Sequence, residues 1–189
     1  MRLIILFFFS FGFCFTQSDK KTYFTKKIED NLSPVIDGEI SDEAWNQVEW
    51  SSGFIQFQPE ENTQPSNQTK YKLLYDNNAV YIFVKSINNP NEIVNRLSRR
   101  DKLEGDAIMI GIDSNNDKIS SFMFCLSSAG TQVDMFASGN GEKEDESWNA
   151  VWYSKTKIDD DGWNAELKIP FSQLRFSNDD NQTWGFNIM

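Results

Sequence analysis

Apolar and polar residues alternate strictly near the end of the chain, with the two-residue period of a half-buried β-strand. The apolar members of this pattern are Trp163, Ala165, Leu167 and Ile169. Residues 159–162, Asp-Asp-Asp-Gly, have the composition of a tight turn. Pro170 ends the strand because proline cannot donate the next ladder hydrogen bond. We therefore expect a hairpin whose first strand is residues 151–158, preceded by an acidic, aromatic loop at residues 142–152.

Short apolar runs separated by turn-forming residues recur along the rest of the chain. They predict strands at residues 50–58, 70–75, 79–86, 107–112, 119–126, 132–137 and 183–188. One short helix is expected after Ser41, whose hydroxyl can cap the first turn, with Trp45 and Val48 on one side. Together these elements favour an all-β fold, an antiparallel β-sandwich with one short N-terminal helix.

The N-terminus, residues 1–18, has the composition of a signal peptide. Arg2 gives a positive start, residues 3–15 are almost wholly apolar, and residues 16–18 offer a cleavage region. An uncleaved anchor is the alternative, although the apolar run is short for a membrane span. Residues 19–27 then form a linker or a loosely attached first strand. Residues 28–189 form the β-sandwich, either complete or truncated at the C-terminus.

The charge and the cysteine content exclude several functions. The formal net charge is −10 and the chain has no histidine. An acidic surface repels phosphate backbones, so nucleic acid is not an expected partner. Without histidine there is no Ser-His-Asp or Cys-His catalysis and no histidine metal ligand. Once Cys14 leaves with the signal peptide, Cys125 cannot form an internal disulfide, and we expect it to be a buried core thiol.

Several short motifs, in order along the chain, resemble those of family 9 carbohydrate-binding modules. They are Pro-Val-Ile-Asp-Gly at 34–38, Asp-Glu-Ala-Trp at 42–45, Leu-Tyr-Asp at 74–76, Val-Tyr-Ile at 80–82, the apolar strand at 106–113 and the hairpin strand at 162–171. Three more motifs, at residues 97–101, 145–148 and 182–187, resemble a subgroup of this family. That subgroup occurs at the N-terminus of secreted or envelope proteins of Gram-negative bacteria, ahead of an uncharacterised, β-rich C-terminal region.

The resemblance implies a β-sandwich that binds sugars, often at chain ends, between aromatic faces, with calcium sometimes bound for structural reasons. It also implies an exported protein in the periplasm, in the outer envelope or outside the cell. One departure stands out: sugar-binding members usually carry a tryptophan in the loop before the strand at Asp106, and residues 99–105 contain none.

Two groups of residues are candidates for carbohydrate binding, because a sugar needs an aromatic plane and a few polar groups around it. The first comprises Trp148, Asn149 and Trp152, and the second comprises Arg99, Arg100 and Asp101. Packing of Trp152 at a strand start is the alternative for the first group. A structural cluster of ion pairs with Glu104, Asp106 or Asp134 is the alternative for the second.

A weak calcium site is predicted at Asp113, Asn115 and Asp117, which offer oxygen ligands at alternate positions, and residues 159–161 carry the same ambiguity between a site and a turn. Lys118 and Phe124 replace the glycine and the glutamate that an EF-hand loop would need, so a solvated turn is the alternative. No other cofactor is predicted.

We therefore predict non-catalytic binding of an oligo- or polysaccharide, in the service of carbohydrate catabolism, by a monomeric domain. No pair of acids is singled out by a motif, so no enzyme is predicted in this chain. One alternative is a structural or interaction module of an outer-envelope protein, with an outer-membrane component as its partner. Another is a domain that targets an attached glycoside-cleaving hydrolase. The sequence leaves open which sugar binds.

Overall fold

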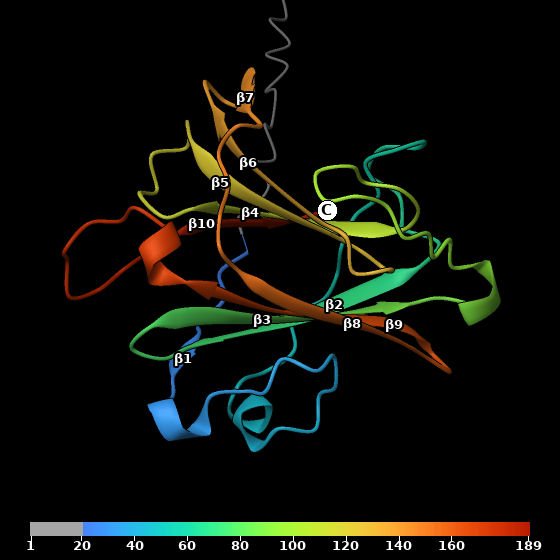
Figure 1. Ribbon diagram of the computed structural model, residues 1–189, viewed down its shortest axis with the longest axis horizontal. Helices are drawn as coiled ribbons and strands as arrows, with labels where there is room; N and C mark the ends of the chain where they lie inside the picture. Colours follow the sequence, from blue (N-terminus) through green and yellow to red (C-terminus); the bar gives the residue numbers. More distant parts are fainter. Residues whose placement is uncertain (1–20) are drawn as a thin grey trace, which may run out of the picture.

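Ten strands form two five-stranded sheets that pack face to face (Figure 1). The structure is a computed structural model, and it describes residues 21–189. The first sheet has the order β1 (Lys26–Lys27), β2 (Gln68–Tyr75), β3 (Ala79–Ile87), β9 (Gly162–Pro170) and β8 (Tyr153–Asp159). The second has the order β10 (Gly185–Ile188), β4 (Ala107–Asp113), β5 (Ser121–Ser127), β6 (Gln132–Ser138) and β7 (Lys143–Asp145). Every neighbouring pair is antiparallel except β1 and β2, so the predicted sandwich is confirmed.

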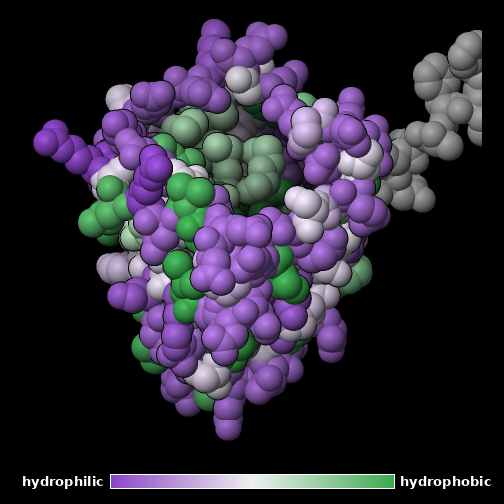
Figure 2. Space-filling model, turned by 90° about the vertical axis from the view of Figure 1, so that its right-hand side faces the viewer, coloured by the Kyte–Doolittle hydropathy of each residue, from purple (hydrophilic) through white to green (hydrophobic). Residues whose placement is uncertain are grey.

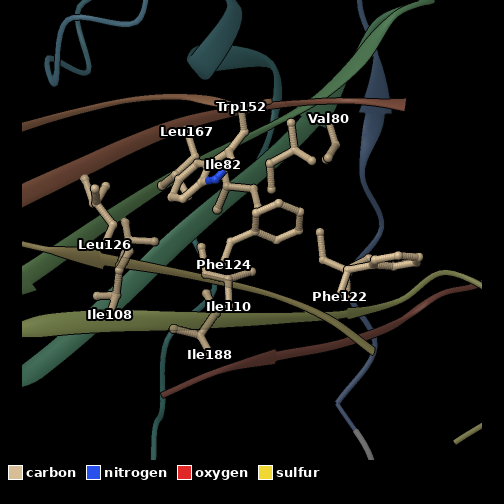
Figure 3. Packing of buried hydrophobic residues seen from close by; sticks show 14 of the residues in the cluster. Val80, Ile82, Ile108, Ile110, Phe122, Phe124, Leu126, Trp152, Leu167 and Ile188 are labelled. Atoms are coloured by element: carbon tan, nitrogen blue, oxygen red, sulfur yellow. The ribbon is translucent and has the colours of Figure 1, made fainter. Parts of the chain in front are cut away.

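The main core lies between the two sheets and follows the alternation in the sequence. Alternate residues of β3, β4, β5 and β9 point inward, and Figure 3 shows Ile82, Leu167, Ile110 and Phe124 meeting across this space. All four are fully buried. Burial of such side chains contributes about 1.5–3 kcal/mol each, which makes this layer the largest favourable term in folding.

A second, smaller core covers the outer face of the first sheet. The segment between β1 and β2 folds back over that face and packs Ile28 and Trp45 against Leu74, Tyr81 and Phe83. The indole of Trp45 is fully buried. Trp45 is therefore a core residue, although its core lies outside the sandwich rather than between its sheets.

The predicted N-terminal α-helix is wrong. The segment forms a short 3-10 helix, η2 (Glu43–Gln47), and three others are shorter still: η1 (Asp30–Leu32), η3 (Pro90–Glu92) and η4 (Phe171–Gln173). The N-cap of η2 is Asp42, and no side chain caps it; the amide of Trp45 bonds the carbonyl of Asp42 three residues earlier. A single tight turn is enough to bury Trp45, and so few residues do not favour an α-helix.

Two further predictions need correction. Residues 50–58 form no strand: they make isolated bridges only, at Ser51 and Gln56, and the side chains of Ile55 and Phe57 are largely exposed. Conversely, the predicted loop at 142–152 contains a strand, β7. All three residues of β7 are exposed, because it is an edge strand that pairs through its backbone alone and has no apolar pattern to detect.

The remaining strands lie where the alternation predicts them. In the hairpin of β8 and β9, Asp159 pairs with Gly162 across Asp160 and Asp161. Gly162 has φ 139°, and a Cβ there would stand 2.1 Å from the carbonyl oxygen of Ser86, so only glycine fits. Among the described residues no helix is long and apolar enough to cross a membrane. The predicted signal peptide lies outside the residues that the structure describes.

Candidate functional site

Arg100 closes the open side of the sandwich between β6 and β8. Its guanidinium donates to Oδ1 of Asp134, to Oε1 of Gln132 at 2.7 Å and to the carbonyl of Ala150 at 3.2 Å. Gln132 and Asp134 belong to β6, whereas Ala150 precedes β8, so this one side chain joins the two sheets. We call this place the seam; it comprises Arg100, Gln132, Asp134, Ala150 and Trp152.

Asp134 is the buried acid of the seam, with 2% of its surface exposed. Besides Arg100, it accepts from the amide of Ala150 at 2.7 Å and from the indole Nε1 of Trp152 at 3.1 Å. These donors serve both carboxylate oxygens, which a buried charge requires. The alternative predicted for Arg100 was a structural ion pair. The structure shows this ion pair, and its partner is Asp134.

The two tryptophans proposed for stacking differ in exposure. Trp152 is 5% exposed, and its ring packs edge-on against Phe124 in the main core (Figure 3), so it has no free face for a ligand. Trp148 is half-buried, with its ring 5.2 Å from that of Phe122 and 5.7 Å from that of Phe124. Trp148 alone keeps part of its indole at the surface.

Arg99, Asp101 and Asn149 are exposed around the same seam. Asp101 has a positive φ of 64°, and its amide bonds the carbonyl of Gln132 at 3.0 Å, which anchors this turn to β6. Arg99 takes part in none of the ion pairs among residues 21–189. The structure thus brings the two predicted groups together on one side of the molecule, where Arg100 and Trp152 serve the scaffold and the exposed members remain available.

An open groove of about 630 Å³ adjoins the seam. It is lined by residues 128–130 of the β5–β6 turn, by Ser154, Lys155, Thr156 and Ile158 of β8, and by Asn95 and Leu97. Ser154 connects the groove to the seam, because its hydroxyl accepts a hydrogen bond from Nε2 of Gln132 at 2.9 Å. Hydroxyls, an amide and an ammonium group next to apolar side chains suit a polyhydroxylated ligand.

The lining of the groove, all within the described residues, contains no aspartate or glutamate. Hydrolysis of a glycosidic bond needs two carboxyl groups on either side of the bond. The groove therefore lacks the acid pair that would cleave such a ligand.

The carboxylates of the calcium candidate are engaged within their own turn. The two oxygens of Asp113 accept from the amides of Asp117, at 3.1 Å, and Lys118, at 2.8 Å. Asp117 accepts from the amides of Ile119 and Ser120 at 2.7 and 2.8 Å. Among residues 21–189 no group of three or more Asp, Glu, Cys or His side chains converges to hold a metal. The carboxylates of Asp113 and Asp117 therefore accept hydrogen bonds from the amides of their own turn.

A second buried carboxylate, Glu166, holds the N-terminal segment on the first sheet. Its Oε2 accepts from the amides of Asp37 and Gly38 at 3.0 and 2.9 Å, and its Oε1 accepts from Nε1 of Trp45 at 3.1 Å. Burial raises the pKa of Glu166 to about 7, and the three N–H donors oppose that rise only in part. Glu166 has a structural role and lies apart from the groove.

The sequence analysis named Asp134 only as one of three possible ion-pair partners of the arginines, and it did not single out Gln132 or the residues of the groove. One signal was present for Asp134: it occupies an inward position of β6, between Gln132 and Phe136, where an apolar residue is the rule. The groove gave no signal, because its residues come from three separate stretches of the chain.

The fold is a two-sheet β-sandwich with an open groove beside the seam. The family model described as "Carbohydrate family 9 binding domain-like" matches residues 36–189. The chain belongs to this family. None of the curated proteins matches it significantly.

Solved structures similar to this chain include two of a family 9 carbohydrate-binding module from Caldicellulosiruptor kristjanssonii. The complex with cellotriose is 25% identical, with a TM-score of 0.62 over 89% of this chain and 75% of that one. The complex with glucose is 27% identical, with a TM-score of 0.59 over 86% and 76%. A Bacteroides uniformis protein has a TM-score of 0.64 over 87% and 80%, but at 14% identity it shows the fold alone.

Proposed function

We propose that this domain binds oligosaccharides without catalysis, in the groove and on the exposed side chains of the adjoining seam. Family membership carries the proposal, together with the relatives bound to cellotriose and glucose. The groove supplies suitable chemistry: Thr156, Ser154 and Asn95 can bond hydroxyls, and Leu97 and Ile158 offer apolar contact to C–H faces. Arg99, Asp101 and Asn149 would bond further hydroxyls, and the exposed part of Trp148 would stack on a ring.

Calorimetric titration with glucose, cellotriose and xylo-oligosaccharides tests this function. We expect saturable binding that Thr156→Val weakens by about fivefold, since a lost hydrogen bond costs about 1 kcal/mol. Glu60→Gln, in the exposed loop before β2, is the matched control and should bind as the wild type does. Absence of heat with every sugar would refute carbohydrate binding.

A structural or interaction module is the second candidate, and two observations favour it. Residues 99–105 lack the tryptophan usual in sugar-binding members, and Arg100 and Trp152 are used inside the scaffold. A folded chain that shows no heat of binding with any of the sugars would support this alternative. The third candidate, targeting of a glycoside-cleaving hydrolase, predicts that the isolated chain binds sugar but releases no reducing ends.

We also infer that the protein is exported to the periplasm, the outer envelope or the exterior of a Gram-negative cell, and that its domain precedes a β-rich C-terminal region in the longer members of its subgroup. The support is the composition of residues 1–18 and the subgroup motifs. N-terminal sequencing of the protein from fractionated cells tests export.

A structural calcium ion at Asp113, Asn115 and Asp117 stays a hypothesis, to be tested by a calcium-dependent rise in thermal stability. We expect a monomer with no resident cofactor.

A further inference from the structure

Every sulfur atom of the described residues lies on one surface, the outer face of the second sheet. The chain has five methionines and two cysteines, of which Met1 and Cys14 lie outside the described residues. The other five are Met109, Cys125, Met123, Met135 and Met189, and we call them the sulfur face. Neither hydrophobic core contains methionine or cysteine. Met109, Met123 and Met135 are instead half-buried.

Strand register places these side chains next to one another. Met109 of β4 is directly opposite Cys125 of β5, and Met123 of β5 is directly opposite Met135 of β6. Met189 is paired with Met109 through two backbone hydrogen bonds of 2.8 and 2.9 Å. Side chains directly opposite each other have Cβ atoms about 5 Å apart. The two pairs are neighbours along β5, about 7 Å from each other. The flexible thioethers can therefore reach the Cys125 sulfur.

A glycine makes room for one of these sulfurs. Sδ of Met123 stands 3.1 Å from the position that a Cβ on Gly111 would occupy, so the Met123 side chain leans from β5 over β4. That lean carries its thioether toward the strand that holds Met109. The hydroxyl of Ser121 also donates to Sδ of Met123 at 3.3 Å. Cys125 is nearly inaccessible, so it lies beneath the side chains around it.

Charge also suits a cation at the sulfur face. Glu144 of β7 is opposite Ala137 of β6, on the same face as the methionines, and it is exposed at the rim. The chain as a whole carries a net charge of −10. Figure 2 shows one end of the molecule, where an apolar hollow is ringed by hydrophilic side chains.

We propose that the sulfur face binds monovalent copper, with the sulfur of Cys125 and the thioethers of Met109, Met123 and Met135 as ligands. Thiolate and thioether donors select Cu(I) over hard cations such as calcium or magnesium. Binding replaces the S–H bond of Cys125 by an S–Cu bond and releases its proton to solvent, and the copper keeps its oxidation state. The site is independent of the carbohydrate groove, which lies against β8 of the other sheet.

The first experiment titrates the reduced full chain with Cu(I) under argon, in competition with bicinchoninate, while the ε-methyl NMR signals of the methionines are recorded. We expect one copper ion per chain, with shifts of the Met109, Met123 and Met135 methyl signals. Calcium and magnesium should leave those signals in place. Unmoved methyl signals at saturating Cu(I) would overturn the proposal.

Variants test whether the sulfur atoms form one copper-binding site. Cys125→Ala and the double variant M109L/M123L should each weaken copper binding at least tenfold. Val133→Ile, beside Cys125 on the same face, keeps every sulfur and should bind within twofold of wild type. Wild-type affinity in the double variant would refute the assignment. If that variant unfolds, the single variant M123L decides the question, because a true site predicts a smaller copper-induced shift at the Met109 methyl.

Discussion

The indole of Trp45 donates a 3.1 Å hydrogen bond to Glu166, and both residues are fully buried on the outer face of the first sheet. The same carboxylate holds the amides of Asp37 and Gly38. The Ile-Asp-Gly turn, the short 3-10 helix and the hairpin strand β9 thus meet at one side chain. Three stretches that are separate in the sequence form one structural unit around Glu166.

Replacement of Glu166 by glutamine should destabilise the fold by about 2–4 kcal/mol, because the amide nitrogen would face N–H donors and leave at least one of them unsatisfied. Urea unfolding followed by tryptophan fluorescence measures this loss. Glu60→Gln serves as the exposed control and should unfold at the wild-type midpoint. Equal stability of the two variants would show that the N-terminal segment does not depend on Glu166.

The stability contribution of Glu166 should depend on pH. Its pKa is raised from 4.5 to about 7 in the folded chain, so the folded state binds the proton more tightly than the unfolded state does. This contribution is complete below pH 4.5 and is lost as the pH rises to about 7, a change of about 3 kcal/mol at 1.36 kcal/mol per pKa unit.

Unfolding free energies of the wild type and Glu166→Gln, measured from pH 4.5 to 7.5, provide the test of this pH dependence. The difference between the two proteins removes the opposite contributions of Asp76 and Asp159, whose pKa values are lowered. The wild type should lose stability relative to the variant as the pH rises. A flat difference would contradict the raised pKa of Glu166.

Arg100→Ala should destabilise the fold by about 2–3 kcal/mol, because it removes the cation from the fully buried carboxylate of Asp134. The guanidinium is itself partly exposed, which keeps the expected loss below that of a fully buried pair. A double-mutant cycle with Asp134→Asn isolates the coupling. Once Asp134 is neutral, Arg100→Ala should cost much less. Additive losses in the cycle would argue against the seam as a unit.

The two tryptophans of the seam should separate stability from binding. Trp152→Phe removes a buried hydrogen bond to Asp134 and should cost about 1–3 kcal/mol of stability, with sugar affinity retained once the protein is folded. Trp148→Ala should lower sugar affinity instead. Chemical unfolding and calorimetric titration of both variants check this division. Loss of affinity in Trp152→Phe alone would reverse the two roles.

The sequence determined the strands that carry a strong apolar pattern. In β9 the apolar residues alternate with polar ones and are buried between the sheets, so the period of two is written directly into the chain. It also indicated the family, because the motif at 34–38 and the hairpin strand at 162–171 occur along the chain in the same order as in family 9 carbohydrate-binding modules. Edge strand β7 escaped prediction, since a strand that pairs only through its backbone needs no apolar residues.

Tertiary structure decided which polar residues are structural and which are available. Nothing local distinguishes Arg100 from Arg99, yet the first is bound to a buried acid and the second takes part in none of the ion pairs among residues 21–189. Trp152 is likewise buried within the scaffold, whereas Trp148 keeps part of its indole at the surface. The groove and the sulfur face depend on strand register, which brings residues far apart in the sequence within a few ångströms. Such neighbourhoods arise from long-range pairing, and the local period of a sequence does not encode which strands become neighbours.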